Sequence, residues 1–177
     1  MRHKLKLMGI FFLLLVSFTA LSGCGVKEAS SSTPMSFPAF STKDLNGNVV
    51  TQDIFAKKRL TVVNVWGTFC PPCIGEMPEL GTWAREMPED VQIIGLICDV
   101  SGADDRERLD LARKITTEAR ADFVNIYPDE ALFDTLSDVE AVPTTFFVDS
   151  KGKVVGDPIV GADVAGYRRF VEHYLNE

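Results

Sequence analysis

The feature that most restricts the fold is a pair of cysteines placed between a buried strand and a helix. Residues 60–66 form a β-branched, apolar run that is typical of a strand buried on both faces. Cys70-Pro-Pro-Cys73 follows this run, and apolar residues then recur at helical spacing to about Met87. A buried strand that leads through such a pair into a helix favours an α/β domain.

The rest of the chain alternates between predicted strands and helices. We expect strands at 40–45, 49–51, 60–66, 91–98, 145–149 and 153–160, and helices at 70–87, 104–119, 130–137 and 163–175. Asn46-Gly47 supplies the positive φ of a type I′ turn, and Pro78 predicts a kink in the first helix. This order predicts a mixed central β-sheet flanked by helices, with an N-terminal β-hairpin and an antiparallel far edge.

The first residues have the composition of a targeting segment. Arg2, Lys4 and Lys6 precede an apolar run at 10–20, which is shorter than the ~20 residues that a membrane-spanning helix needs. The run leads into Leu-Ser-Gly-Cys24, which resembles the lipobox of bacterial lipoproteins. The resemblance implies cleavage before Cys24 and attachment of lipid to that cysteine. The alternative is an ordinary secretory peptide in which Cys24 stands by chance.

Small and polar residues follow the cysteine and are typical of a flexible tether. The predicted organisation is therefore a lipoprotein signal peptide at 1–23, a lipidated Cys24 with its tether at 24–36, and one domain at 37–177.

Cleavage before Cys24 leaves an acidic domain. The chain has a formal net charge of −7, and the removed segment carries three positive and no acidic residues, so the remainder carries −10. Such a domain lacks the phosphate-neutralising surface that nucleic-acid binding requires. Covalent lipid rather than a basic surface would hold it at the membrane. The predicted location is extracytoplasmic, with a lipid anchor in the cell membrane.

The cysteine pair could be redox-active or half of a zinc site. Zinc usually takes four ligands from Cys and His, but His173 is the only histidine after Cys24 and is far from the pair in the sequence. The same shortage argues against a multi-histidine metal centre. We expect no metal, and no glycine-rich phosphate loop indicates a nucleotide or flavin. The redox group is then the Cys70–Cys73 disulfide itself.

Disulfide exchange needs an attacking thiolate and a second thiol that resolves the mixed disulfide. A helix that begins at Cys70 places partial positive charge at that thiol, lowers its pKa and makes it the solvent-facing attacking group. Cys73, one turn further, is then buried and resolving. Pro71 and Pro72 suit the first helical turn, but they remove two N–H groups that could stabilise a thiolate. We therefore expect a moderately lowered pKa, which favours a reductant over a strong oxidant.

The motifs around this pair resemble the active site of the thioredoxin superfamily. The residues that carry the resemblance are Trp66, Phe69, Cys70, Pro71, Pro72, Cys73 and Pro78, together with Val142-Pro143-Thr144. The last motif is similar to the family's cis-proline loop, which faces the disulfide and helps to bind substrate backbone; a trans loop proline is the alternative. The resemblance implies substrate contacts at Trp66, Phe69, Pro71, Pro72, Val142, Pro143 and Thr144.

Finer features are similar to the TlpA/ResA-like branch of that superfamily. They are the Asn-Gly hairpin, the strand at 62–66 and the sequence Cys73-x-x-Glu76-Met77-Pro78. Members of this branch are typically anchored or secreted thiol–disulfide oxidoreductases, and many are reductants that serve cytochrome c maturation.

Two further residues have competing interpretations. Thioredoxins often place a buried Asp six residues before the first cysteine, where this chain has Asn64, which takes no proton. Glu76 lies three residues after Cys73, on the same helical face. The resemblance implies that Glu76 raises the pKa of the buried thiol and accepts its proton; the alternative is a solvated glutamate. Cys98 ends a predicted strand, and the end of this strand should lie at the same edge of the sheet as Cys70. Cys98 could be a third redox thiol; we favour the alternative, a buried apolar residue.

The favoured function is reduction of protein disulfides. The resemblance implies a membrane electron donor of CcdA or DsbD type, and clients such as apocytochrome c, another redox protein or a methionine sulfoxide reductase. A disulfide oxidant or isomerase would use the same residues. A peroxidase is disfavoured because Gly67, rather than Thr or Ser, stands three residues before Cys70. A binding-only lipoprotein is disfavoured by the motifs, and a monomer is the default state.

Overall fold

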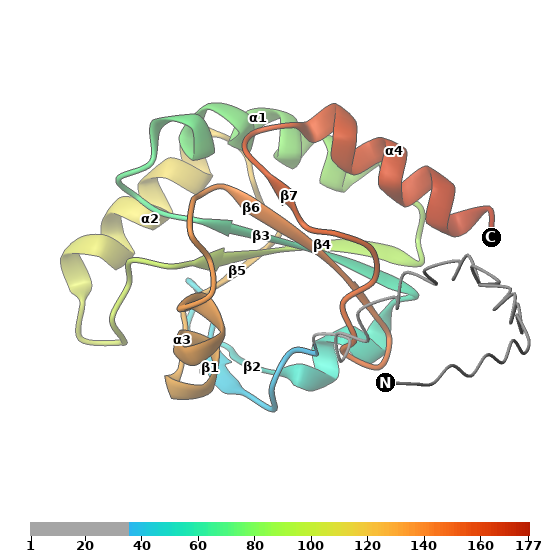
Figure 1. Cartoon of the computed structure of the whole chain (residues 1–177). Helices are drawn as coiled ribbons and strands as arrows, with labels where there is room; N and C mark the ends of the chain where they lie inside the picture. The colour runs from blue at the N-terminus through green and yellow to red at the C-terminus, as the bar shows by residue number, and fades with distance from the viewer. Residues whose placement is uncertain (1–35) are drawn as a thin grey trace, which may run out of the picture. The chain divides into compact units, whose positions relative to one another are not determined.

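The computed structural model describes residues 36–177, so the predicted signal peptide, Cys24 and all but the end of the tether lie outside the described range. The strands are β1 (Ser41–Lys43), β2 (Val49–Thr51), β3 (Leu60–Trp66), β4 (Val91–Ile97), β5 (Val124–Ile126), β6 (Thr144–Asp149) and β7 (Ile159–Val160). The helices are the 3-10 helix η1 (Gln52–Lys57) and the α-helices α1 (Pro71–Glu86), α2 (Arg106–Glu118), α3 (Glu130–Leu136) and α4 (Val164–Leu175). The predicted α/β fold with a mixed sheet is confirmed (Figure 1).

The main sheet has the strand order β5-β4-β3-β6-β7, and β1 and β2 form a separate hairpin. β3 lies at the centre and pairs in parallel with β4 and antiparallel with β6. Because β3 and β6 run in opposite directions, the end of β3 lies beside the start of β6, where Val65 is opposite Thr144. This register places the loop that carries Cys70 next to the loop that carries Pro143.

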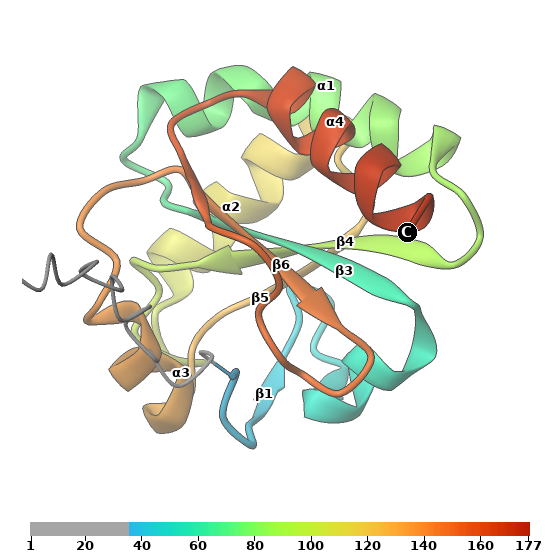
Figure 2. The ribbon, with the colours of Figure 1, turned by 45° about the vertical axis from the view of Figure 1, so that its right-hand side comes forward.

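Helices cover both faces of the sheet. α1, α2 and α4 lie over one face, whereas α3, η1 and the β1–β2 hairpin lie on the other (Figures 1 and 2). Alternate residues of β3 therefore enter different cores. Val62 and Trp66 pack in the core beneath α1 and α4, and Val63 and Val65 pack in the core on the hairpin side. Asn64 shares the face of Val62 and Trp66, which directs its amide toward α1.

The hairpin turn differs from the type I′ turn that the sequence predicts. Gly47 has a φ of +86°, but Arg120 is the only non-glycine residue in the described range with a positive φ, so Asn46 keeps an ordinary conformation. The Gly47 N–H donates to the Asp44 carbonyl, and the Asp44 carboxylate accepts from the N–H groups of Asn46 and Asn48. The aspartate side chain organises the turn, so glycine alone needs the left-handed region.

Two strand predictions need correction. The strand expected at 153–160 is limited to Ile159–Val160, and Lys153 and Val154 form only isolated bridges. Gly156, with a φ of +69°, turns the backbone between these segments. β5 is absent from the sequence prediction because three residues are too few to show an alternating pattern. α1 runs without a break from Pro71 to Glu86 and includes Pro78. The kink at Pro78 stays a prediction.

Candidate active site

Cys70 and Cys73 form a disulfide at the N-terminus of α1, with their Cα atoms 5.3 Å apart. Cys70 is the N-cap residue, and its Sγ accepts a hydrogen bond from the Cys73 N–H at 3.3 Å. Pro71 and Pro72 occupy the first helical positions, where a missing N–H costs no helical hydrogen bond. The disulfide between the two predicted cysteines is therefore present, and the helix begins one residue later than expected.

The disulfide is more enclosed than the sequence suggests. Cys73 is fully buried, and the exposed fraction of Cys70 is only 4%. The expectation that Cys70 faces solvent is wrong for this oxidised state, although Cys70 is the more exposed of the two. The enclosure comes from the neighbouring loop, because the Val142 carbonyl oxygen lies 3.5 Å from Cys70 Sγ.

The loop before β6 is held on both sides. The Val142–Pro143 peptide bond is cis, as the resemblance implies. The Pro143 carbonyl accepts a hydrogen bond from the Gly161 N–H at 2.8 Å. The Thr144 hydroxyl donates to the Ala141 carbonyl at 2.7 Å and so ties the loop to itself. The backbone at 142–144 therefore faces the disulfide from a supported position.

Glu76 is buried behind the disulfide, with an exposure of only 6%. The Asn64 amide donates to Oε1 at 2.9 Å, and the Tyr167 hydroxyl lies 3.1 Å from Oε2. Burial raises the pKa of Glu76 from 4.5 to about 7, against the opposing effect of these two hydrogen bonds. The interpretation as a solvated glutamate is wrong. A carboxyl group that titrates near neutral pH, one turn after Cys73, is able to take up and release a proton there.

A sequence model of the Redoxin family matches residues 33–168. This chain belongs to the Redoxin family. Thiol-disulfide oxidoreductase ResA of Bacillus thuringiensis subsp. konkukian is 27% identical over 161 residues, which cover 87% of each chain. Thioredoxin-like protein YneN of Bacillus subtilis is 28% identical over 171 residues, 89% of this chain and 91% of the relative.

Among solved structures, a thiol:disulfide interchange protein of the thioredoxin family from Chlorobium tepidum superposes with a TM-score of 0.66. It is 21% identical and covers 81% of this chain and 98% of its own. The resemblance to the thioredoxin superfamily and to its ResA-like members is thus confirmed. With its Cys70–Cys73 disulfide, the Redoxin-family protein is a thiol–disulfide oxidoreductase.

Trp66 does not take part in the surface around the disulfide of this oxidoreductase. It is still within β3, its side chain is fully buried, and its indole N–H donates to Asn125 Oδ1 at 3.0 Å. The predicted substrate contact of Trp66 is wrong for this structure, because the strand directs the ring into the core. Phe69, by contrast, is 66% exposed, and Pro71 and Pro72 are also exposed.

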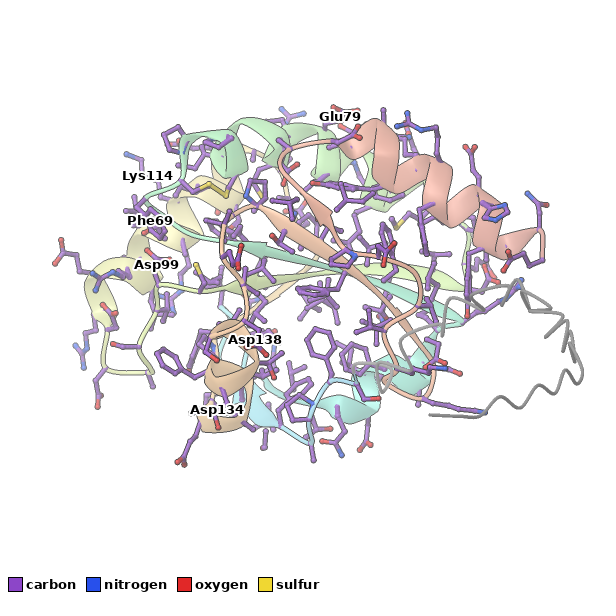
Figure 3. All side chains as sticks on the ribbon, viewed as in Figure 1. Phe69, Glu79, Asp99, Lys114, Asp134 and Asp138 are labelled. Carbon is purple, nitrogen blue, oxygen red and sulfur yellow. A yellow bond between two sulfur atoms is a disulfide. The ribbon has the colours of Figure 1, made fainter. Side chains whose placement is uncertain are left out.

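Asp99 supports the loop that carries the exposed aromatic residue. Its carboxylate accepts from the Thr68 N–H at 3.0 Å and from the Thr68 hydroxyl at 2.6 Å. Figure 3 labels Phe69 and Asp99 at the same end of the sheet. Asp99 therefore holds the backbone between β3 and the cysteines.

Cys98 follows β4 directly and lies at the predicted edge of the sheet, where its N–H donates to the Trp66 carbonyl at 2.8 Å. The residue is half-buried and unpaired. Burial, together with the charge of Asp99, raises the pKa of the thiol to about 11. This environment disfavours a thiolate and fits the interpretation of Cys98 as an apolar residue.

Residues 36–177 contain neither a metal-binding cluster nor a membrane-spanning helix. In this part of the chain, no three His, Cys, Asp or Glu side chains are grouped so that they could hold a metal ion. None of the helices in the same range combines the length and apolar character that crossing a membrane requires.

Sequence reasoning missed Tyr167 and Asn125. Tyr167 is fully buried on α4 and reaches Glu76 across 91 positions of sequence. Its helical spacing marks it as a core residue, and only the packing of α4 beside α1 shows that its hydroxyl meets a carboxylate. Asn125 lies in β5, which was itself not predicted.

Proposed function

We propose that this oxidoreductase is an extracytoplasmic, lipid-tethered reductant of protein disulfides. The observation that carries the proposal is the weak stabilisation around Cys70 and the acidic group behind Cys73. Among residues 36–177, Cys70 Sγ accepts one hydrogen bond, from the Cys73 N–H, and Pro71 and Pro72 have no N–H to offer. A thiolate with so little support makes the reduced form less favourable, which lowers the reduction potential toward that of a reductant.

The reaction begins with the reduced dithiol. The Cys70 thiolate attacks one sulfur of a client disulfide, so that a Cys70–client bond forms and the other client sulfur leaves as a thiolate. Cys73 then transfers its proton to the ionised Glu76 carboxylate, and its thiolate attacks Cys70 Sγ. The second client sulfur leaves, takes up a proton, and the Cys70–Cys73 disulfide forms. Two electrons pass from the oxidoreductase to the client.

The client binds around the disulfide. Phe69, Pro71 and Pro72 offer an exposed apolar surface on one side of Cys70. The backbone of Val142, which precedes the cis peptide bond, lies on the other side and can pair with an extended segment of the client. Contacts of this kind depend on backbone and apolar surface, so they suit an unfolded or flexible client segment.

The proposed location rests on the N-terminal sequence, and the proposed partners rest on the resemblance to the TlpA/ResA-like branch. Arg2 to Cys24 supports export and lipid attachment, and the acidic domain would remain tethered outside the cell membrane. Re-reduction of the Cys70–Cys73 disulfide then requires a membrane electron donor of CcdA or DsbD type. Apocytochrome c, another redox protein or a methionine sulfoxide reductase would be the client.

The test is the reduction potential of the Cys70–Cys73 couple, measured by equilibration of the purified protein in glutathione buffers. A potential near that of thioredoxin, about −270 mV, would support the reductant. A potential near that of the strong oxidant DsbA, about −120 mV, would overturn it and favour the alternative, in which the protein introduces or rearranges disulfides.

A further inference from the structure

The Tyr167 hydroxyl contacts one buried carboxylate and two partly buried backbone groups. It is 3.1 Å from Glu76 Oε2 and 2.7 Å from the Gly161 carbonyl oxygen. It also accepts a hydrogen bond from the Asp163 N–H at 3.3 Å. Tyr167 and Glu76 are both buried, so water is not a ready substitute for a hydrogen bond lost between them.

These contacts cannot all be satisfied in both charge states of Glu76. A tyrosine hydroxyl has one proton to donate. When Glu76 is ionised, both Glu76 and Gly161 offer only acceptors, and the hydroxyl can serve one of them. When Glu76 is protonated, it donates to the tyrosine oxygen, and the hydroxyl proton is free for Gly161. An ionised, buried carboxylate loses more than a partly exposed carbonyl when it lacks a donor, so the charge of Glu76 decides which way the hydroxyl points.

Gly161 connects this choice to the cis-proline loop. Its N–H donates to the Pro143 carbonyl at 2.8 Å, while its own carbonyl is the second acceptor of Tyr167. The two peptide groups meet at the Cα of Gly161, which has a φ of +94° and joins β7 to α4. A hydrogen bond gained or lost at the carbonyl therefore acts on the residue that holds Pro143 in place.

We propose that Tyr167 is a positioning residue that couples the charge of Glu76 to the loop at 142–144 through Gly161. The hydroxyl donates to Glu76 while the carboxylate is ionised and to the Gly161 carbonyl once Glu76 is protonated. When Cys73 passes its proton to Glu76, the hydroxyl turns to Gly161 and secures the loop beside Cys70. The coupling rests on the proposed role of Glu76 as the proton acceptor.

The surroundings of Glu76 leave few other groups to account for such coupling. From β3, Asn64 is neutral, and its amide donates both to Glu76 and to the Thr145 hydroxyl of β6. On α1 itself, Glu79 contributes a like charge that raises the pKa of Glu76, and Figure 3 shows it on the outer face of the helix. From α4, burial raises the pKa of Tyr167 to about 12, so its hydroxyl keeps its proton at neutral pH.

The experiment uses the full chain in its oxidised form and a matched pair of substitutions. Tyr167→Phe removes the hydroxyl, and Tyr174→Phe makes the same change on the same helix, where the ring packs against Phe170 and Arg59. Carboxyl ¹³C NMR follows the titration of Glu76, assigned with Glu76→Gln, and amide NMR follows Gly161 in the same samples.

In the wild type, we expect the Gly161 amide to titrate with the same midpoint as Glu76. In Tyr167→Phe, the midpoint of Glu76 rises by about one pH unit, because the ionised form loses a donor, and Gly161 no longer follows it. Tyr174→Phe behaves as the wild type. The proposal is overturned if Gly161 does not follow Glu76 in the wild type, or if Tyr167→Phe leaves both titrations unchanged.

If Tyr167→Phe does not fold, Glu76→Gln decides the question alone. Loss of the Gly161 titration in Glu76→Gln supports the coupling, and its persistence rules the coupling out. These readouts need no client and no reduction, so they are independent of the reduction potential. A strongly oxidising couple would overturn the proposed function and leave the NMR result intact.

Discussion

Asn64 donates a hydrogen bond of 2.9 Å to Glu76, inside the core that lies behind the disulfide. The bond joins the central strand β3 to α1, and both side chains are buried. Because an amide cannot take a proton, the strand position contributes no titratable group. The acid chemistry of this interior therefore rests on one carboxyl, which α1 carries three residues after Cys73.

Glu76 should make the protein less stable as the pH rises. The folded state binds the proton with a pKa of about 7, and a free glutamate has a pKa of 4.5, so the folded state holds more protons between these values. The free energy of unfolding then falls across that range by about 3 kcal/mol at most. Glu76→Gln removes this contribution, and urea denaturation from pH 4.5 to pH 8 measures it as the difference between the two proteins.

The control is Glu79→Gln on the same helix, where the side chain is exposed. The free energy of unfolding of Glu79→Gln, relative to that of the wild type, should change by less than about 0.5 kcal/mol over the same pH range. Parallel stability curves for the wild type and Glu76→Gln would show instead that folding leaves the pKa of Glu76 unchanged despite its burial.

Substitution of Cys70 and substitution of Cys73 should block the reaction at different steps. Cys70→Ser removes the attacking thiolate and should lower disulfide reductase activity at least about a hundredfold. Cys73→Ser keeps the attacking group and loses the resolving one, so a mixed disulfide with the client should accumulate. Non-reducing gels and mass spectrometry detect this adduct, and Cys98→Ser provides the control with normal turnover. An adduct that forms through Cys73 in Cys70→Ser would reverse the assigned roles.

The sequence predicts the fold well wherever a long pattern repeats. The apolar run at 60–66 and the helical spacing after Cys73 define the centre of the sheet and α1, because burial on both faces and on one helical stripe leaves clear patterns. β5 and the shortened β7 are different, since strands of two or three residues depend on their neighbours rather than on their own sequence.

The candidate site also has a part that the sequence predicts and a part that it does not. Cys70, Cys73 and Pro143 stand in motifs with fixed spacing, and the disulfide and the cis peptide bond match them. The contact between Glu76 and Tyr167 has no sequence signal, because an apolar stripe on α4 reads as core whatever a hydroxyl at its edge meets. The enclosure of Cys70 likewise depends on how closely two distant loops approach.

Gly95 should tolerate no side chain. It lies in β4 opposite Asn64, and a Cβ there would overlap Asn125 Oδ1 and stand 2.9 Å from Trp66 Nε1. Gly95→Ala would break the buried Trp66–Asn125 hydrogen bond and cost about 2–4 kcal/mol of unfolding free energy. Gly75→Ala on α1 meets nothing within 4 Å and should stabilise by about 0.5–1 kcal/mol. Chemical denaturation measures the free energy of unfolding of both variants. Equal changes in the two variants would contradict the close packing around Gly95.

Phe69 should matter for the client and little for the fold. Its side chain is 66% exposed beside Cys70, and Phe133 on α3 is 60% exposed and serves as a matched control. Phe69→Ser should lower kcat/KM for disulfide reduction about fivefold to thirtyfold, mainly through KM, because about 1–2 kcal/mol of apolar contact is lost. Phe133→Ser should leave the kinetics unchanged. Equal kinetics for all three proteins would remove Phe69 from the client surface.

Cys98 should react slowly with thiol reagents. In oxidised protein with Cys24→Ser, Cys98 is the one remaining thiol in the sequence. Burial raises its pKa from 9.0 to about 11, so at pH 8 the thiolate population should be about a hundredfold below that of an unperturbed thiol. A chromogenic disulfide reagent should label it at a correspondingly reduced rate, and the full rate should return in denaturant. Rapid labelling of the folded protein would instead identify Cys98 as an accessible third thiol at the edge that carries Cys70.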